Sequence, residues 1–286
     1  MIGSDLPLIR LVDTQFSHAP GGMGNGDLPI HPSYFRWHRG DSQVGDVVVI
    51  TEQCFRVAPE QPEAIKVGFI VEPRCVSPWV YSTENKRWVA ENFDFVYSHD
   101  IDFIASGGSS RCQFRYAPLG GTWIDPSNWK VLDKDAGVSI IVSSKAATVG
   151  HQLRHEIVRS LAGKHGVDVY GRGYRPIQDK REALSRYRYS IVIENEKSVG
   201  WFTEKLIDCF ACGTVPLYWG DPNVSQSFLD IPVFDGIEGI DKLLAHPPKV
   251  LNHVIGHNLE AAKSYAITED WLWLHGLMDL VQSRGD

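Results

Sequence analysis

Two basic residues, Arg154 and Lys205, follow predicted strands at places where helices are expected to begin. Arg154 is expected in the first turn of one helix, and Lys205 comes shortly after Thr203, which can cap the next helix. A helix N-terminus favours anions, because its unpaired backbone N–H groups carry partial positive charge. Two cations at two such helix starts would suit a diphosphate.

The segment around these two residues is basic within an acidic chain. Residues 145–205 hold 12 Lys and Arg against 7 Asp and Glu, whereas all 286 residues hold 28 against 35, a formal charge of −7. A solvated basic face is the alternative to an anion site. The acidic balance of the whole chain argues against a general nucleic-acid binder.

Predicted strands and helices alternate along the chain, and these elements must position the two basic residues. Leu153, Ile157 and Leu161 mark one face of a helix. Strands are expected at 8–12, 46–50, 66–71, 93–97, 138–142, 167–170, 190–193 and 214–219, and further helices at 179–188 and 203–212. This alternation predicts an α/β fold with parallel sheets, arranged as two doubly wound, Rossmann-like lobes with a ligand cleft between them.

The polar, aperiodic stretch Asp125–Ala136 predicts a linker between the two lobes. The predicted division is therefore 1–135 and 136–266, followed by an apolar helix in 267–286 that begins with a Thr268 cap and packs onto a lobe. Pro216 is expected to make its strand begin late or lie locally unpaired, because proline lacks a ladder donor.

No apolar run approaches the roughly 20 residues that a membrane span needs, and the first residues, MIGSDLPLIRLVD, lack the pattern of a signal peptide. The five cysteines are few and scattered, which favours reduced thiols in a cytoplasmic protein and leaves peripheral membrane attachment open. Cys209 and Cys212 form a C-x-x-C, and we expect two buried thiols rather than a metal or redox site.

The segment 191–220, IVIENEKSVGWFTEKLIDCFACGTVPLYWG, is the most informative part of the chain. Its strand ends at Ile193 and delivers Glu194 and Asn195 to the carboxyl edge of the sheet. A loop then leads to the helix that Thr203 can cap, and Gly213 is expected to stop that helix.

This segment resembles the donor-binding signature of the family-10 glycosyltransferases, the α-1,3/4-fucosyltransferases. The matching parts are Ile193-Glu194-Asn195-Glu196, then Trp201-Phe202-Thr203-Glu204-Lys205, then Gly213 through Gly220. Upstream, SIIVSSKAATVGHQLRHEIVRSL and VDVYGRG resemble the opening elements of the family's donor lobe, and KVGFIVE (66–72) resembles part of its first lobe.

The resemblance implies a two-lobed GT-B architecture, with the acceptor on the first lobe and the donor on the second. It implies inverting transfer of fucose from GDP-fucose to a hydroxyl of a glycan acceptor, with no metal or other cofactor required. It implies Glu72 as the catalytic base, with Asp13 and Glu52 as alternatives at the ends of other strands. The residues implied to bind the donor are Arg154, Gly171, Glu194, Asn195, Trp201, Thr203, Glu204 and Lys205.

Two departures from the family pattern concern the donor sugar. Trp201 stands where the family has a tyrosine, and Glu196 where a small polar residue is usual. Two alternatives therefore stay open: a transferase of the same fold that uses another nucleotide sugar, and a non-catalytic carbohydrate-binding relic. The D-x-D at Asp100–Asp102 falls in the first lobe and is not expected to bind a metal.

Overall fold

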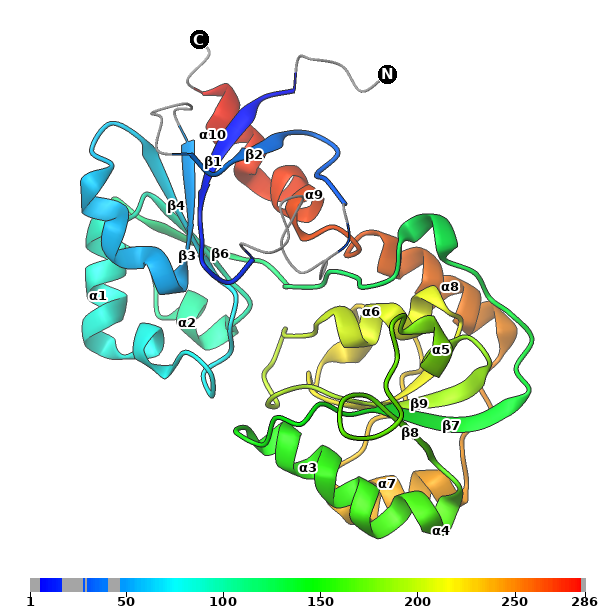
Figure 1. Cartoon of the computed structure of the whole chain (residues 1–286). Helices are drawn as coiled ribbons and strands as arrows, with labels where there is room; N and C mark the ends of the chain where they lie inside the picture. Colours follow the sequence, from blue (N-terminus) through cyan, green and yellow to red (C-terminus); the bar gives the residue numbers. More distant parts are fainter. Residues whose placement is uncertain (1–5, 17–27, 29, 41–46, 284–286) are drawn as a thin grey trace. The chain divides into compact units, whose positions relative to one another are not determined.

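The computed structural model describes residues 6–16, 28, 30–40 and 47–283. The chain divides into two compact units, residues 1–119 with 267–286, and residues 120–266 (Figure 1). Each unit contains one parallel β-sheet, so the predicted α/β fold with two parallel-sheet lobes is confirmed. The cleft between the lobes stays a prediction.

The first unit is built on a six-stranded sheet in which every neighbouring pair is parallel. In spatial order its strands are β2 (Arg36–His38), β1 (Leu8–Val12), β3 (Val47–Thr51), β4 (Ile65–Ile70), β5 (Phe95–Ser98) and β6 (Gln113–Tyr116). Both faces are apolar: Val47 and Val49 belong to one core cluster, Val48 and Ile50 to another. A strand buried on both faces reads as a continuous apolar run, which is why β3 is recognisable from the sequence.

The two faces of this sheet are covered by helices from different parts of the chain. One face packs against the 3-10 helices η1 (Glu52–Glu60) and η2 (Pro78–Tyr81) and the helices α1 (Thr83–Asn92) and α2 (Ile101–Ala105). The other face packs against the last helices of the chain, shown in red in Figure 1: α9 (Thr268–Leu272), η6 (Trp273–Leu277) and α10 (Met278–Gln282).

The C-terminal segment therefore belongs to the first unit, and it differs in detail from the predicted continuous helix. His275 and Gly276 leave the helical conformation, and Gly276 has φ of 123°, which favours glycine. Thr268 does not cap the helix; its hydroxyl donates to the carbonyl of Leu119, and Ile267 takes the N-cap position.

The second unit is built on a four-stranded parallel sheet with helices on both faces. In spatial order its strands are β10 (Val215–Trp219), β9 (Tyr187–Ile193), β7 (Ala136–Ile141) and β8 (Asp168–Tyr170). Helix α3 (Val149–Ile157) and its continuation η4 (Val158–Ala162) and α4 (Gly163–His165) cover one face with α7 (Gly236–Ala245). Helices α6 (Glu204–Ala211) and α8 (Asn252–Lys263) cover the other.

The boundary between the units lies between Leu119 and Gly120, which corrects the predicted linker. The stretch 125–136 belongs to the second unit, where hydrogen bonds rather than apolar periodicity hold it. Lys130 N donates to Ala211 O at 2.9 Å, and Lys134 Nζ donates to Ser185 O and Cys212 O at 2.8 and 2.6 Å. This polar stretch is ordered because backbone carbonyls distant in sequence accept hydrogen bonds from its donors.

Two local predictions in the second unit are wrong. The predicted helix 179–188 shrinks to α5 (Arg181–Leu184), because its last residues already belong to β9. Pro216 is paired opposite Ser190 within a strand that starts at Val215. β10 is the edge strand of its sheet, and beyond its neighbour β9 it makes only a bridge from Tyr218 to Val233. A position on that outer side tolerates the missing proline N–H.

Helix α6 matches its prediction at both ends. Thr203 is its N-cap, and Gly213 follows its end with φ of 63°. Cys209 and Cys212 are free, buried thiols, and burial raises the pKa of both, that of Cys212 to about 11. The expected burial of both thiols is confirmed, and a raised pKa makes a thiol a poorer nucleophile.

Candidate functional site

The carboxylate of Glu194 anchors the start of helix α6. Glu194 follows β9 and is completely buried. Its Oε1 accepts a hydrogen bond from Thr203 N at 3.0 Å, and its Oε2 accepts one from Thr203 Oγ1 at 2.8 Å. The end of the strand and the N-cap of the helix are thus locked together, and both Glu194 oxygens are engaged by the protein itself.

Lys205 brings a cation to this helix start. Its Nζ donates to Thr203 Oγ1 at 2.9 Å and lies 3.4 Å from both Glu194 Oε2 and Glu204 Oε1. The side chain is 29% exposed, so the ammonium is held by the protein yet open to solvent. It is positioned to bind an anion that approaches the N-terminus of α6.

Arg154 reaches the same strand end from the other side of the sheet. Its Nε and Nη2 donate to Ile193 O at 3.0 and 2.5 Å, and Nη2 also donates to Asn195 Oδ1 at 3.2 Å. Arg154 and Lys205 therefore converge on residues 193–195, the juxtaposition on which a diphosphate site depends.

Arg154 does not occupy the first turn of its helix, which corrects the prediction. Helix α3 begins at Val149, because the side chain of Thr148 accepts from His151 N and the His151 ring accepts from Thr148 N. Arg154 consequently lies in the last turn of α3 and is 5% exposed. It contributes its charge from a buried position rather than from a helix tip.

His151 is a buried neighbour of these cations. It is 7% exposed, and burial lowers its pKa to about 4, helped by the charges of Arg154, Lys145 and Lys205. A histidine whose pKa lies that low is neutral at pH 7. Several cations thus gather around the start of α3 and the end of β9.

Helix α3 approaches the end of β9 so closely that only glycine fits at Gly150. Gly150 N donates to Asn195 O at 3.0 Å, and a Cβ on Gly150 would lie 1.8 Å from Glu194 O. The contact is backbone against backbone, so neither side can give way by changing a rotamer.

We predict that Gly150→Ala destabilises the protein by about 3 kcal/mol, because either α3 or the 193–195 segment must shift. Gly163→Ala is the matched control: Gly163 is helical with φ of −67°, and its Cβ would meet nothing within 4 Å. That control is expected to be neutral or stabilising by up to about 1 kcal/mol. Urea unfolding of both variants checks the difference, and equal stabilities would contradict the tight approach.

A buried ion-pair network extends from Glu204 along α6, and sequence reasoning missed it. Lys180 Nζ lies 2.7 Å from Asp208 Oδ2 and 3.4 Å from Glu204 Oε1. Burial alone would raise the pKa of Glu204, but Lys205 and Lys180 bring it down to about 2. Glu204 is therefore ionised at any ordinary pH and shares its charge between two ammonium groups.

Close packing surrounds two other residues of the predicted donor site, Trp201 and Gly171. Trp201 is 1% exposed, so neither face of its indole is open for stacking in this structure. Gly171 has φ of 110°, and a Cβ there would lie 2.1 Å from Val142 O. Glycine is therefore required at position 171 by its turn and by the close approach of the Val142 carbonyl just after β7, whatever Gly171 binds.

In the first unit, Glu72 is one of the three carboxylates considered as a base. It lies just beyond β4, is half-buried, and its carbonyl accepts from Tyr81 Oη at 2.7 Å. Glu52 is completely buried; its Oε1 accepts from Gln15 Nε2 at 2.6 Å and its Oε2 from Val71 N at 3.0 Å. Burial raises the pKa of Glu52, and the charge of Glu72 adds to that effect.

The third carboxylate and the D-x-D motif are both engaged in ion pairs. The side chain of Asp13 is 1% exposed and pairs with Arg39 Nε at 3.0 Å. Asp100 caps α2, accepting from Phe103 N at 2.7 Å, and pairs with Arg74. Within the described part of the chain, no group of three or more His, Cys, Asp or Glu side chains could hold a metal ion.

The segment that contains this charged site matches a known protein family in sequence. The family described as glycosyltransferase family 10 (fucosyltransferase), C-terminal part, matches residues 131–246. The match includes β7, α3, β9, α6 and β10. The match covers less than half of the chain, and residues 131–246 are called the family-10 segment below after the family that they match.

Two curated relatives match part of the chain. The α-(1,3)-fucosyltransferase FucT of Helicobacter pylori is 41% identical over 56 residues, 20% of this chain and 12% of the relative. A fucosyltransferase-like protein of Arabidopsis thaliana is 34% identical over 101 residues, 31% of this chain and 20% of the relative. The chain thus matches less than a quarter of the length of these two relatives.

Solved structures resemble the whole chain rather than the family-10 segment alone. A crystal structure of an α1,3-fucosyltransferase has a TM-score of 0.57 at 17% identity, over 99% of this chain and 92% of that one. An α1,3-fucosyltransferase with GDP has a TM-score of 0.51 at 18% identity, over 94% of both chains. Anabaena HepE in complex with UDP and glucose has 0.57 at 8% identity, over 96% of this chain and all of the other. At these identities the likeness shows the fold.

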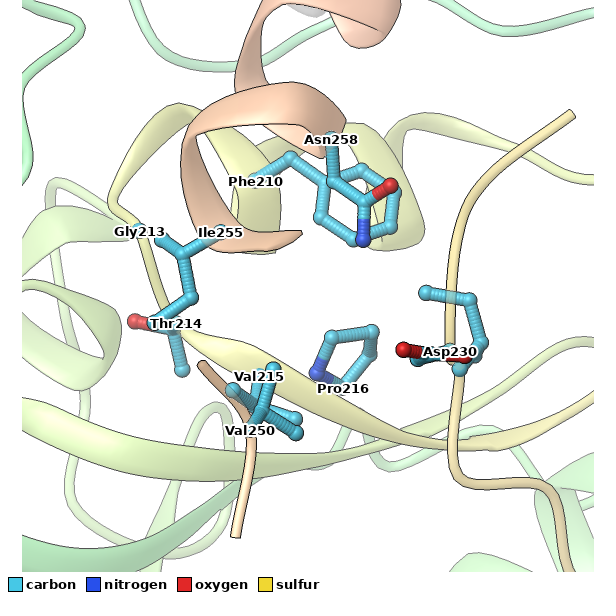
Figure 2. Close-up of a pocket in the computed structure, with 10 residues that line it drawn as sticks. Phe210, Gly213, Thr214, Val215, Pro216, Asp230, Val250, Ile255 and Asn258 are labelled. Carbon is cyan, nitrogen blue, oxygen red and sulfur yellow. The ribbon is translucent and has the colours of Figure 1, made fainter. Parts of the chain in front are cut away.

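The family-10 segment also borders a small cavity that lies away from the charged site. It measures about 10 Å³ and is bordered by the edge strand β10, the end of α6 and α8 (Figure 2). Figure 2 shows Pro216 and Phe210 facing it, and the Asn258 amide beside it bonds the backbone of Leu229. The space is about that of one water molecule, so it is a packing gap.

None of the helices in the described ranges is both long enough and apolar enough to cross a membrane.

Proposed function

We propose that this chain is an inverting glycosyltransferase that transfers fucose from GDP-fucose to a hydroxyl of a glycan acceptor. One observation carries the proposal: within a family-10 segment, Lys205 and Arg154 converge on the end of β9 beside the N-terminus of α6. Cations beside a helix N-terminus are the arrangement that binds phosphate groups.

In this proposal Lys205 binds the diphosphate directly, because its ammonium is partly exposed. Arg154 adds charge from behind and orients Asn195 toward the nucleotide, since two of its nitrogens already hold Ile193 O and Asn195 Oδ1. Glu204 accepts hydrogen bonds from sugar or ribose hydroxyls. Thr203 and Glu194 fix the helix start that presents these groups.

The chemical step is a single displacement. The acceptor oxygen bonds to the anomeric carbon of fucose as the bond from that carbon to the GDP oxygen breaks, so the anomeric configuration inverts. The acceptor proton passes to the carboxylate of Glu72, and the new negative charge on GDP is stabilised by Lys205 and Arg154. One bond forms, one bond breaks and one proton moves to Glu72, so no other reactant is needed.

The experiment is a binding panel on the wild-type protein, read by calorimetry. GDP-fucose and GDP are expected to bind with micromolar Kd, and GDP-fucose is expected to turn over when glycan acceptors are added. A protein that binds glycans but neither GDP nor GDP-fucose would be a carbohydrate-binding relic, and the proposal would be wrong.

A second candidate is transfer from another nucleotide sugar. It is favoured by Trp201, which replaces the tyrosine of the family pattern, and by the fold shared with Anabaena HepE, whose structure holds UDP and glucose. UDP-glucose and GDP-mannose therefore belong in the panel, and tighter binding of either than of GDP-fucose would select this candidate.

A further inference from the structure

Lys180 occupies a position that the proposed reaction does not use. It precedes α5 and is 24 residues before Glu204, yet its side chain is buried against α6, with 13% exposed. Its ammonium lies 2.7 Å from Asp208 Oδ2, 3.4 Å from Glu204 Oε1 and 4.4 Å from the centre of the Trp123 ring. A lysine enclosed by two acids and an indole is built into the site rather than placed on a surface.

The two acids lie one turn apart on the same face of α6, so their charges repel each other. Asp208 is completely buried, and its Oδ1 accepts from Thr122 Oγ1 at 2.6 Å and from Trp123 N at 2.9 Å. Those donors are neutral. Lys180 therefore supplies the counter-charge that Asp208 needs in order to stay ionised there.

Glu204 is shared between two cations at equal distances. Its Oε1 lies 3.4 Å from Lys180 Nζ and 3.4 Å from Lys205 Nζ. Lys205 in turn lies 3.4 Å from the buried carboxylate of Glu194. Lys180 and Lys205 thus pair with three carboxylates (Glu194, Glu204, Asp208). Arg154 makes no described ion pair with these acids, but its charge interacts with those of Glu194 and Glu204. The three cations balance the three acids, so the network is neutral before any anion arrives.

We propose that Lys180 is a positioning residue for the anion site: it holds the charges of Glu204 and Asp208 and so leaves the ammonium of Lys205 able to bind a diphosphate. This inference rests on the proposed function, because it assumes a phosphate-bearing donor at Lys205. Without Lys180, the network carries one net negative charge, and Lys205 becomes the remaining cation beside Glu204.

The test compares Lys180→Met with a matched lysine variant, Lys134→Met. Lys134 is also half-buried in the second unit, but its Nζ donates only to the neutral oxygens of Ser185, Cys212 and Thr214. Both substitutions remove a lysine ammonium that bonds to other parts of the second unit, whereas only Lys180→Met removes charge from the network. Binding of GDP-fucose and of inorganic pyrophosphate is measured by calorimetry, well below the unfolding temperature of each variant.

We expect Lys180→Met to weaken binding of both ligands by about 10- to 100-fold, and Lys134→Met to change it by less than about threefold. Lys180→Arg keeps the charge and should restore binding to within about threefold of wild type. The double variant Lys180→Met/Asp208→Asn restores the neutral balance and should recover most of the lost affinity. Equal losses in the single and double variants would show that Lys180 acts through packing alone, and the inference would be wrong.

Asp208→Asn alone keeps the test decisive if Lys180→Met does not fold. Asparagine can still accept from Thr122 and Trp123, while the network gains one positive charge. Pyrophosphate binding should then become several-fold tighter; unchanged or weaker binding contradicts the inference. If the wild type binds pyrophosphate but no nucleotide sugar, the proposed function fails and these variants still test Lys180. If it binds neither, both fail.

Discussion

Replacing Lys205 by methionine is expected to weaken GDP-fucose binding by about 100-fold, the loss of a charge-assisted contact to phosphate. Methionine keeps the length of the apolar stem and removes only the ammonium. That ammonium is the partly exposed cation at the start of α6, since Arg154 is buried and committed to Ile193 and Asn195. The Kd from calorimetry at low and moderate salt measures the effect, which should shrink as salt rises.

The matched control is Lys197→Met, in the loop after the same strand. Lys197 Nζ pairs with the exposed Asp235 at 2.9 Å and contacts none of the residues at the start of α6 through a described hydrogen bond or ion pair. Its loss removes the same formal charge from the same segment. We expect a Kd within about twofold of wild type, because a surface ion pair contributes little. If both variants lose affinity equally, Lys205 acts only through net charge, and a specific phosphate contact is excluded.

The start of α6 could be predicted from sequence because every signal for it is local. Thr203 has the side chain of an N-cap, Leu206, Ile207 and Phe210 fall on one helical face, and Gly213 supplies the left-handed residue that ends the helix. Local chemistry and tertiary packing agree at this place, so the sequence pattern and the structure coincide.

The position of Arg154 could not be predicted because the start of α3 carries an unusual signal. A capping box normally pairs Ser or Thr with Glu or Gln three residues later, whereas here Thr148 pairs with His151. Gly150 in the first turn also lowers the apparent helix propensity. The tertiary reason for that glycine, the backbone of Glu194 and Asn195, lies more than forty residues away in sequence.

Lys180 and the domain boundary were missed for the same physical reason. In QDKRE, Lys180 looks like a solvated surface lysine, and only the fold brings it to Asp208, 28 residues later. Residues 125–136 look like a linker because their order comes from hydrogen bonds such as Lys130 N to Ala211 O at 2.9 Å. Hydrophobic periodicity cannot predict such contacts, because they join polar groups that are distant in sequence.

Replacing Glu72 by glutamine is expected to lower kcat for fucosyl transfer by about 10²- to 10⁴-fold while leaving the Kd of GDP-fucose within about twofold of wild type. Glutamine keeps the shape of the side chain but cannot take the acceptor proton. The nucleotide contacts proposed here all lie in the second unit, whereas Glu72 follows β4 in the first. Initial rates with an acceptor, and calorimetry without one, separate the two effects.

Glu91→Gln is the surface control and Glu52→Gln the discriminating variant. Glu91 is 57% exposed on α1 and pairs only weakly with Arg87, so its loss should leave kcat unchanged. Glu52 is fully buried and accepts hydrogen bonds from Val71 N and Gln15 Nε2. We therefore expect it to position the chain beside Glu72 rather than to contact an acceptor. Glu52→Gln should therefore lower kcat less than Glu72→Gln does. A larger loss in Glu52→Gln, with Glu72→Gln near wild type, would transfer the role of base to the buried carboxylate and require the acceptor to reach the interior of the first unit.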